Sequence, residues 1–269
     1  MAYADGRISA AAALIALALA SAPAAAHEFW IALRDGTVAP GAAIVADLKV
    51  GQKLRGEPYP YLTSRFRSFT VTLGGTTTGV AGNEGDIPAL SLIAERSGLH
   101  VIAQNTIAFR VTYDDWAVFR RYLADEGLDS FADLHRARGL PESGFAERYT
   151  RYVKALVQVG PVDPADRDVR IGMPLELVAE VNPYAPEVEV LPVILTWRGA
   201  PVAGRQINIF RDDGAVTRTT ATTDEAGRAL IPLTGDGEYL LNAVVLRPVD
   251  DDTTPVVWAS HWATLSFRL

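Results

Sequence analysis

Four histidines and no cysteines limit the transition-metal chemistry that this 269-residue chain could support. Without thiolates, a transition-metal site would have to use imidazole nitrogens, helped by carboxylate or backbone groups. The histidines are widely separated in the sequence, so no local ligand motif joins them. They are His27, His100, His135 and His261.

The first histidine follows a stretch that is typical of a cleavable signal peptide. Residues 10–26 form an apolar, alanine-rich run with Arg7 ahead of it, and the run ends in the small residues 24–26. It is shorter than a membrane-spanning helix needs and is broken by Pro23, which disfavours an uncleaved anchor. We therefore predict cleavage after Ala26, a periplasmic location and a mature chain that begins at His27 without a membrane span.

A free N-terminal histidine can bind a metal ion through both its α-amine and its imidazole. This bidentate arrangement suits Cu(II) or Ni(II), which favour nitrogen ligands in tetragonal geometry. The alternative is that His27 merely happens to follow the cleavage site. Both interpretations remain open from the residues alone.

Two further histidines lie in predicted strands and complete a candidate metal site of His27, His261 and His100. His261 shares a strand face with Ala259 and Leu265, where a polar ring needs a partner such as a metal, a water or a carbonyl. If the site exists, these three histidines should converge within about 5 Å. His135 lies on a polar predicted helix and is expected to be a solvated surface residue.

Composition and motifs give no support for an enzyme or a nucleic-acid-binding protein. The net charge is −7, whereas nucleic-acid binders normally carry a basic surface. We find no P-loop, dinucleotide fingerprint or G-x-S-x-G motif, and His27-Glu28 does not begin an H-E-x-x-H motif. Ser260 and His261 should face opposite sides of a strand, which disfavours a dyad. A brace-type copper oxidase is a weaker alternative.

The elements that position these residues are predicted to be mainly strands. Residues 27–113 have strand character, and helical periodicity follows within about 114–159. Three helices are expected there: one from Asp114 or Asp115 to Gly127, one over residues 130–138, and one over residues 147–157. Strands resume at 175–180, and the rigid segment 182–186 is a candidate boundary.

The predicted fold class is therefore mainly β, with two β-sandwich domains of immunoglobulin or transthyretin type. The predicted organisation is a signal peptide over 1–26, an N-terminal β domain over 27–186 that carries the helical insertion, and a C-terminal β-sandwich over 187–269.

Several segments together resemble a known family of exported bacterial proteins. They are Ala26-His27-Glu28-Phe29-Trp30-Ile31 and residues 122–128, 147–156, 204–210 and 260–267. The chain resembles domain-of-unknown-function family 4198, whose members are often labelled periplasmic nickel-uptake or cobalt-transport components. Residues 199–241 also resemble a carboxypeptidase-regulatory or transthyretin-like sandwich.

The resemblance implies a periplasmic protein that handles divalent metal and has no established catalytic activity. It maps the family's histidines onto His27 and His261, and His100 onto a polar position. The expected function is capture or delivery of nickel, cobalt or copper, with the metal ion and a membrane metal transporter as partners. The alternative is a non-catalytic cell-envelope interaction or adhesion module, in which His27 is incidental.

Overall fold

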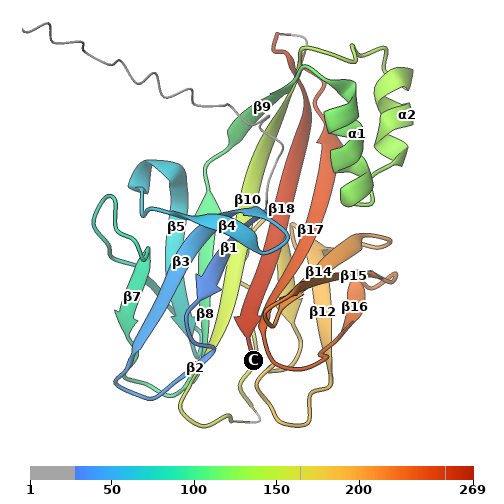
Figure 1. Cartoon of the computed structure of the whole chain (residues 1–269). Coiled ribbons are helices and arrows are strands. Elements are labelled where there is room, and N and C mark those ends of the chain that lie inside the picture. The colour runs from blue at the N-terminus through green and yellow to red at the C-terminus, as the bar shows by residue number, and fades with distance from the viewer. Residues whose placement is uncertain (1–27, 164, 252) are drawn as a thin grey trace, which may run out of the picture.

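The protein is built from three β-sheets and two short α-helices in the part of the chain that the structure describes. This computed structural model describes residues 28–163, 165–251 and 253–269. A ten-stranded sheet lies at the centre, and two four-stranded sheets complete the fold. The mainly β class predicted from the sequence is confirmed (Figure 1).

The central sheet brings together strands from both halves of the sequence. It contains β15 (Val216–Thr222), β14 (Gln206–Asp212), β17 (Glu238–Pro248), β18 (Val256–Arg268), β10 (Phe145–Val159), β8 (Gly98–Thr106), β5 (Phe66–Leu73) and β6 (Thr76–Gly79) in that order. Two further strands, β2 (Thr37–Val38) and β9 (Phe109–Tyr113), pair with β10. Because β10 and β18 pair directly, a division into separate domains at 186/187 is not confirmed.

Strand β10 occupies the position where a third helix was expected, so that prediction over residues 147–157 is wrong. β10 is buried on both faces: Val153, Ala155 and Val157 pack on one side, and Tyr152 and Leu156 pack on the other. A strand buried on both faces is apolar at nearly every position. The spacing of its apolar residues therefore also fits the apolar face of a buried helix, and periodicity alone does not distinguish the two.

Two smaller sheets cover opposite faces of the central sheet. Sheet A consists of β1 (Glu28–Leu33), β3 (Ala43–Gln52), β4 (Arg55–Tyr59) and β7 (Leu90–Ile93). Sheet C consists of β11 (Leu175–Ala179), β12 (Val190–Trp197), β13 (Ala200–Pro201) and β16 (Arg228–Pro232). Each smaller sheet forms its own apolar core with β10, so this strand lies in the middle of the layered structure.

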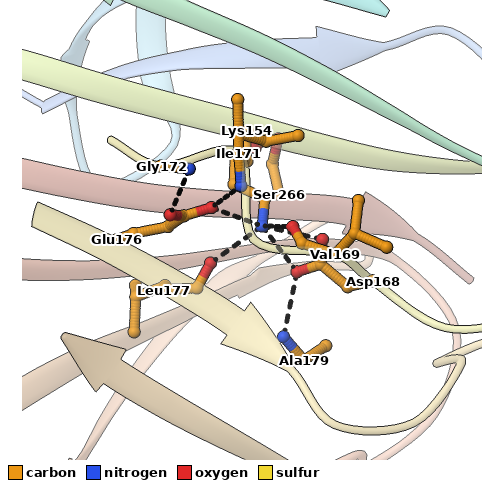
Figure 2. Close-up of polar contacts among 9 residues, drawn as sticks. All are labelled: Lys154, Asp168, Val169, Ile171, Gly172, Glu176, Leu177, Ala179 and Ser266. Atoms are coloured by element: carbon orange, nitrogen blue, oxygen red, sulfur yellow. Dashed lines mark hydrogen bonds and ion pairs between the residues drawn. The ribbon is translucent and has the colours of Figure 1, made fainter. Parts of the chain in front are cut away.

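A buried ion cluster joins β10 to sheet C (Figure 2). Lys154 is 0% exposed, and its Nζ lies 2.7 Å from an Asp168 carboxylate oxygen and 3.4 Å from Glu176 Oε1. Lys154 Nζ also donates to the carbonyls of Val169 and Leu177. The two carboxylates in turn accept backbone N–H bonds from residues 171, 172 and 179.

Two of the predicted helices are confirmed. α1 (Trp116–Asp125) begins after Asp115, whose side chain accepts a hydrogen bond from Ala117 N, as an N-cap residue should. α2 (Ser130–Ala137) follows, and both helices lie beside one end of β17 and β18 (Figure 1). A short 3-10 helix covers Thr63–Arg65. Among the described residues, no helix is long and apolar enough to cross a membrane.

Candidate functional site

His100 lies on β8 and faces the side of the central sheet that sheet A covers. It pairs with Val157 of β10, and its side chain is 5% exposed. Its Nδ1 lies 3.0 Å from the carbonyl oxygen of Gly98. Burial lowers the pKa of His100, so the ring is neutral at physiological pH.

His261 lies on β18 and faces the opposite side of the sheet. Its Nδ1 lies 3.1 Å from the Tyr152 hydroxyl, and its ring packs against Trp197 with centroids 4.4 Å apart. Burial, together with the charges of Arg198, Arg247 and Arg148, lowers the pKa of His261 to about 4. The sequence analysis expected the His261 ring to need a polar partner on this face, and the Tyr152 hydroxyl is that partner. The surrounding positive charge opposes binding of a metal cation.

The structure does not bring His100 and His261 together. Their direct partners on β10 are Val157 and Thr150, which are seven positions apart and on opposite faces of the strand. Seven strand residues span ~23 Å. The expected convergence of these two histidines is therefore wrong, because strand register separates them. His27 lies outside the described residues, and these residues contain no group of three or more His, Asp or Glu that could hold a metal.

His135 is buried, so its expected position on the surface is wrong. It is 0% exposed and packs between Trp116, Phe145 and Trp258. Trp258 Nε1 donates to His135 Nδ1 at 3.0 Å, and Nε2 then donates to the Pro141 carbonyl at 2.9 Å. The polar neighbours on α2 suggested exposure, but the burying aromatic residues come from distant elements.

Two buried acidic residues come from distant parts of the sequence: Glu28 begins β1 and directly follows His27, whereas Glu126 follows α1. Glu28 and Glu126 are both buried. Glu126 Oε2 accepts hydrogen bonds from Asn208 and Asn242, each at 2.9 Å. Burial, followed by the negative charge of Glu28, raises the pKa of Glu126 to about 8. The negative charge of Glu28 is therefore part of the electrostatic surroundings of Glu126, together with the charges of Arg218 and Asp125.

Side chains of β18 hold β1 in this position. Thr264 Oγ1 donates to the Phe29 carbonyl at 3.1 Å, and Ser266 Oγ donates to the Ile31 carbonyl at 2.6 Å. These bonds align β1 along the face of β18. The sequence analysis did not single out Glu126, because no local pattern marks it.

A third buried carboxylate was also missed. Glu147 is 0% exposed and accepts hydrogen bonds from Ser260 Oγ and, at 3.2 Å, from the Tyr113 hydroxyl. Trp262 Nε1 donates to Ser260 Oγ at 3.0 Å. Burial raises the pKa of Glu147 to about 7, although these hydrogen bonds act in the opposite direction. The network holds the aromatic core beneath α1 and α2 to the central sheet.

The fold and the buried charges define a mainly β protein of stacked sheets, with ionisable groups enclosed between its layers. A family model described as "Domain of unknown function (DUF4198)" matches residues 24–247. The chain therefore belongs to this family, as its sequence resemblance indicated.

Two solved structures show a distant likeness. One is described as "D0-D1 domain of Intimin", with 11% identity, coverage of 89% of this chain and 97% of that chain, and a TM-score of 0.22. The other is a tetra-tandem repeat in the extending region of a large adhesion protein, with 12% identity, coverage of 90% and 49%, and a TM-score of 0.22. At these TM-scores neither likeness carries a functional argument.

Proposed function

We propose that this protein is an exported, non-catalytic, divalent metal-binding protein that uses the N-terminal histidine of its mature chain. The metal is its cargo, and nickel, cobalt and copper are the candidates. The observation that supports the proposal is the burial of Glu28, which immediately follows His27, together with the raised pKa of the buried Glu126, to which the charge of Glu28 contributes.

This pair supports cation binding on electrostatic grounds. The raised pKa of Glu126 shows that its buried surroundings disfavour a second negative charge, and a cation bound nearby would favour its ionised form. The amine and imidazole of His27 would supply nitrogen ligands, and the carboxylates would supply compensating charge. His261, which is enclosed by aromatic rings and faces three arginines, is unsuited to the same role.

Histidine variants of the secreted, processed chain test this proposal by isothermal titration with Ni(II) and Cu(II). His27→Ala should weaken binding by about 100-fold, because it removes the chelating imidazole. His100→Ala and His261→Ala should change the dissociation constant by less than about threefold, because neither ring would be a ligand. Mass spectrometry confirms the N-terminus of each preparation.

The carboxylates provide a second arm of the same titration. Glu126→Gln should weaken metal binding by about tenfold, the effect expected for an outer-shell partner. Glu142→Gln, on the exposed surface near α2, is the matched control. Loss of binding in His261→Ala or His100→Ala, with full affinity retained in His27→Ala, would overturn the proposal.

A further inference from the structure

Three exposed arginines form a row across neighbouring strands of the central sheet. Arg110 of β9 pairs with Arg148 of β10. Ala259 of β18 pairs with Arg148 on one side and with Arg247 of β17 on the other. Residues that pair directly place their side chains on the same face of a sheet. Because neighbouring strands lie about 4.8 Å apart, the three arginines lie along a line of roughly 14 Å.

The hairpin between β12 and β13 of sheet C ends beside this row. Trp197, the last residue of β12, packs on the ring of His261, which follows Ala259 by two positions and shares its face. Arg198 comes next and is exposed. The Arg198 guanidinium lies 5.2 Å from the Trp197 ring centroid, and the Arg247 guanidinium lies 5.5 Å from it. Since stacked sheets lie about 10 Å apart, the hairpin forms a step above the row, with Arg198 at its edge.

The four residues Arg110, Arg148, Arg198 and Arg247, here named the arginine surface, have no acidic partners. None of them forms an ion pair with an Asp or Glu in the part of the chain that the structure describes. Arg110 and Arg148 lie directly opposite each other on an antiparallel pair, where like charges are destabilising. Yet the chain has 32 acidic and only 25 basic residues. An anionic ligand would relieve this repulsion.

The spacing of the charges indicates the shape of the ligand. A single small anion contacts two of the arginines at most, so a row of roughly 14 Å favours an elongated chain with several negative groups. The step formed by the hairpin disfavours a flat bilayer. Trp197 already packs against His261 and two guanidinium groups, which disfavours the base stacking that single-stranded nucleic acids use.

We propose that the arginine surface binds an acidic polysaccharide, a polymer whose carboxylate groups recur along an extended chain. Each guanidinium offers paired N–H donors that match a carboxylate. The sugar chain would follow the row of Arg110, Arg148 and Arg247 and pass below Arg198. This surface includes neither His27 nor the buried carboxylates, so the proposal does not depend on the proposed metal-binding function.

Hexagalacturonate, with maltohexaose as a neutral chain of the same length, probes the surface by isothermal titration of the full processed chain in EDTA. At about 50 mM salt, hexagalacturonate should bind with a dissociation constant below about 100 μM, and galacturonate monomer at least about tenfold more weakly. Raising the salt to about 300 mM should weaken binding by about tenfold, because salt screens exposed charges. No binding of hexagalacturonate at about 1 mM, or equal binding of maltohexaose, would overturn the proposal.

Two other polyanions test the identity of the ligand. A hexamer of thymidylate presents phosphates on a single strand, and phosphatidylserine vesicles present anionic headgroups on a flat surface. Both should bind at least about tenfold more weakly than hexagalacturonate. Tighter binding of either one would overturn the assignment to an acidic polysaccharide.

Arginine variants locate the binding. Arg148→Gln and Arg247→Gln should each weaken hexagalacturonate binding by about fivefold or more. Arg120→Gln is the matched control and should leave the affinity unchanged, because Arg120 is exposed on α1, which packs on the opposite face of the central sheet. Equal affinities in Arg148→Gln and Arg120→Gln would contradict the site.

Thermal unfolding separates binding from a structural role. Arg148→Gln removes the repulsion from Arg110, so its unfolding temperature should not fall below that of the parent. A lower unfolding temperature with unchanged affinity would assign Arg148 a structural role and contradict the proposal.

Discussion

Replacing Lys154 with methionine should destabilise the protein by about 3–5 kcal/mol. Lys154 is fully buried between β10 and sheet C, where it contacts both Asp168 and Glu176 (Figure 2). Removing its charge leaves two carboxylates buried without their cation. Methionine retains most of the side-chain volume, so the loss reports the charge interaction rather than a cavity.

Urea unfolding at neutral pH measures this effect. Lys49→Met, a partly exposed lysine on β3, is the matched control and should change the free energy of unfolding by less than about 0.5 kcal/mol. Lys154→Met should markedly lower the urea concentration at the midpoint of unfolding, while the slope of the free energy of unfolding against urea concentration stays similar. A Lys154→Met protein within about 1 kcal/mol of the parent would contradict this role for the ion cluster.

The second large effect is a pH dependence of stability that Glu147 causes. Burial raises the pKa of Glu147 in the folded protein from 4.5 to about 7. The folded protein therefore retains a proton that the unfolded chain releases near pH 4.5. The proton that Glu147 retains in the folded state increases the free energy of unfolding. This increase is fully present below pH 4.5 and is lost as the pH rises through about 7, and above that range the free energy of unfolding no longer changes because of Glu147.

The loss should amount to roughly 3 kcal/mol, because each pKa unit corresponds to about 1.4 kcal/mol. Glu147→Gln cannot ionise, so its free energy of unfolding should decline less than that of the parent between pH 4.5 and 8. Glu95→Gln, an exposed residue, should retain the parent profile. Unfolding curves measured across this range provide the comparison. If the free energies of unfolding of the parent and of Glu147→Gln changed in parallel with pH, the Glu147 carboxyl group would be ionised in the folded protein, which would contradict this prediction.

The sequence predicted the elements whose signals are local. Asp115 and the apolar residues after it define α1, and alternating or glycine-bounded runs define most strands. The third predicted helix was wrong because β10 is apolar on both faces, which periodicity cannot distinguish from a buried helix.

The candidate site was harder to predict because it depends on long-range pairing. His100 and His261 were correctly placed in strands, but only the register of β8 and β18 against β10 separates them. Glu126 and Glu28 are far apart in the sequence, yet the charge of Glu28 contributes to the raised pKa of Glu126. None of these placements has a signature within its own segment.

We propose that metal binding depends on a free α-amine at His27, and a variant with one added residue tests this dependence directly. A processed chain with a single alanine ahead of His27 keeps every side chain but loses the six-membered chelate ring that the α-amine and the imidazole Nδ1 of His27 would close on the metal. It should bind Cu(II) about 100-fold more weakly, with a changed electron paramagnetic resonance spectrum. Full affinity with an unchanged spectrum in the extended chain would contradict the account.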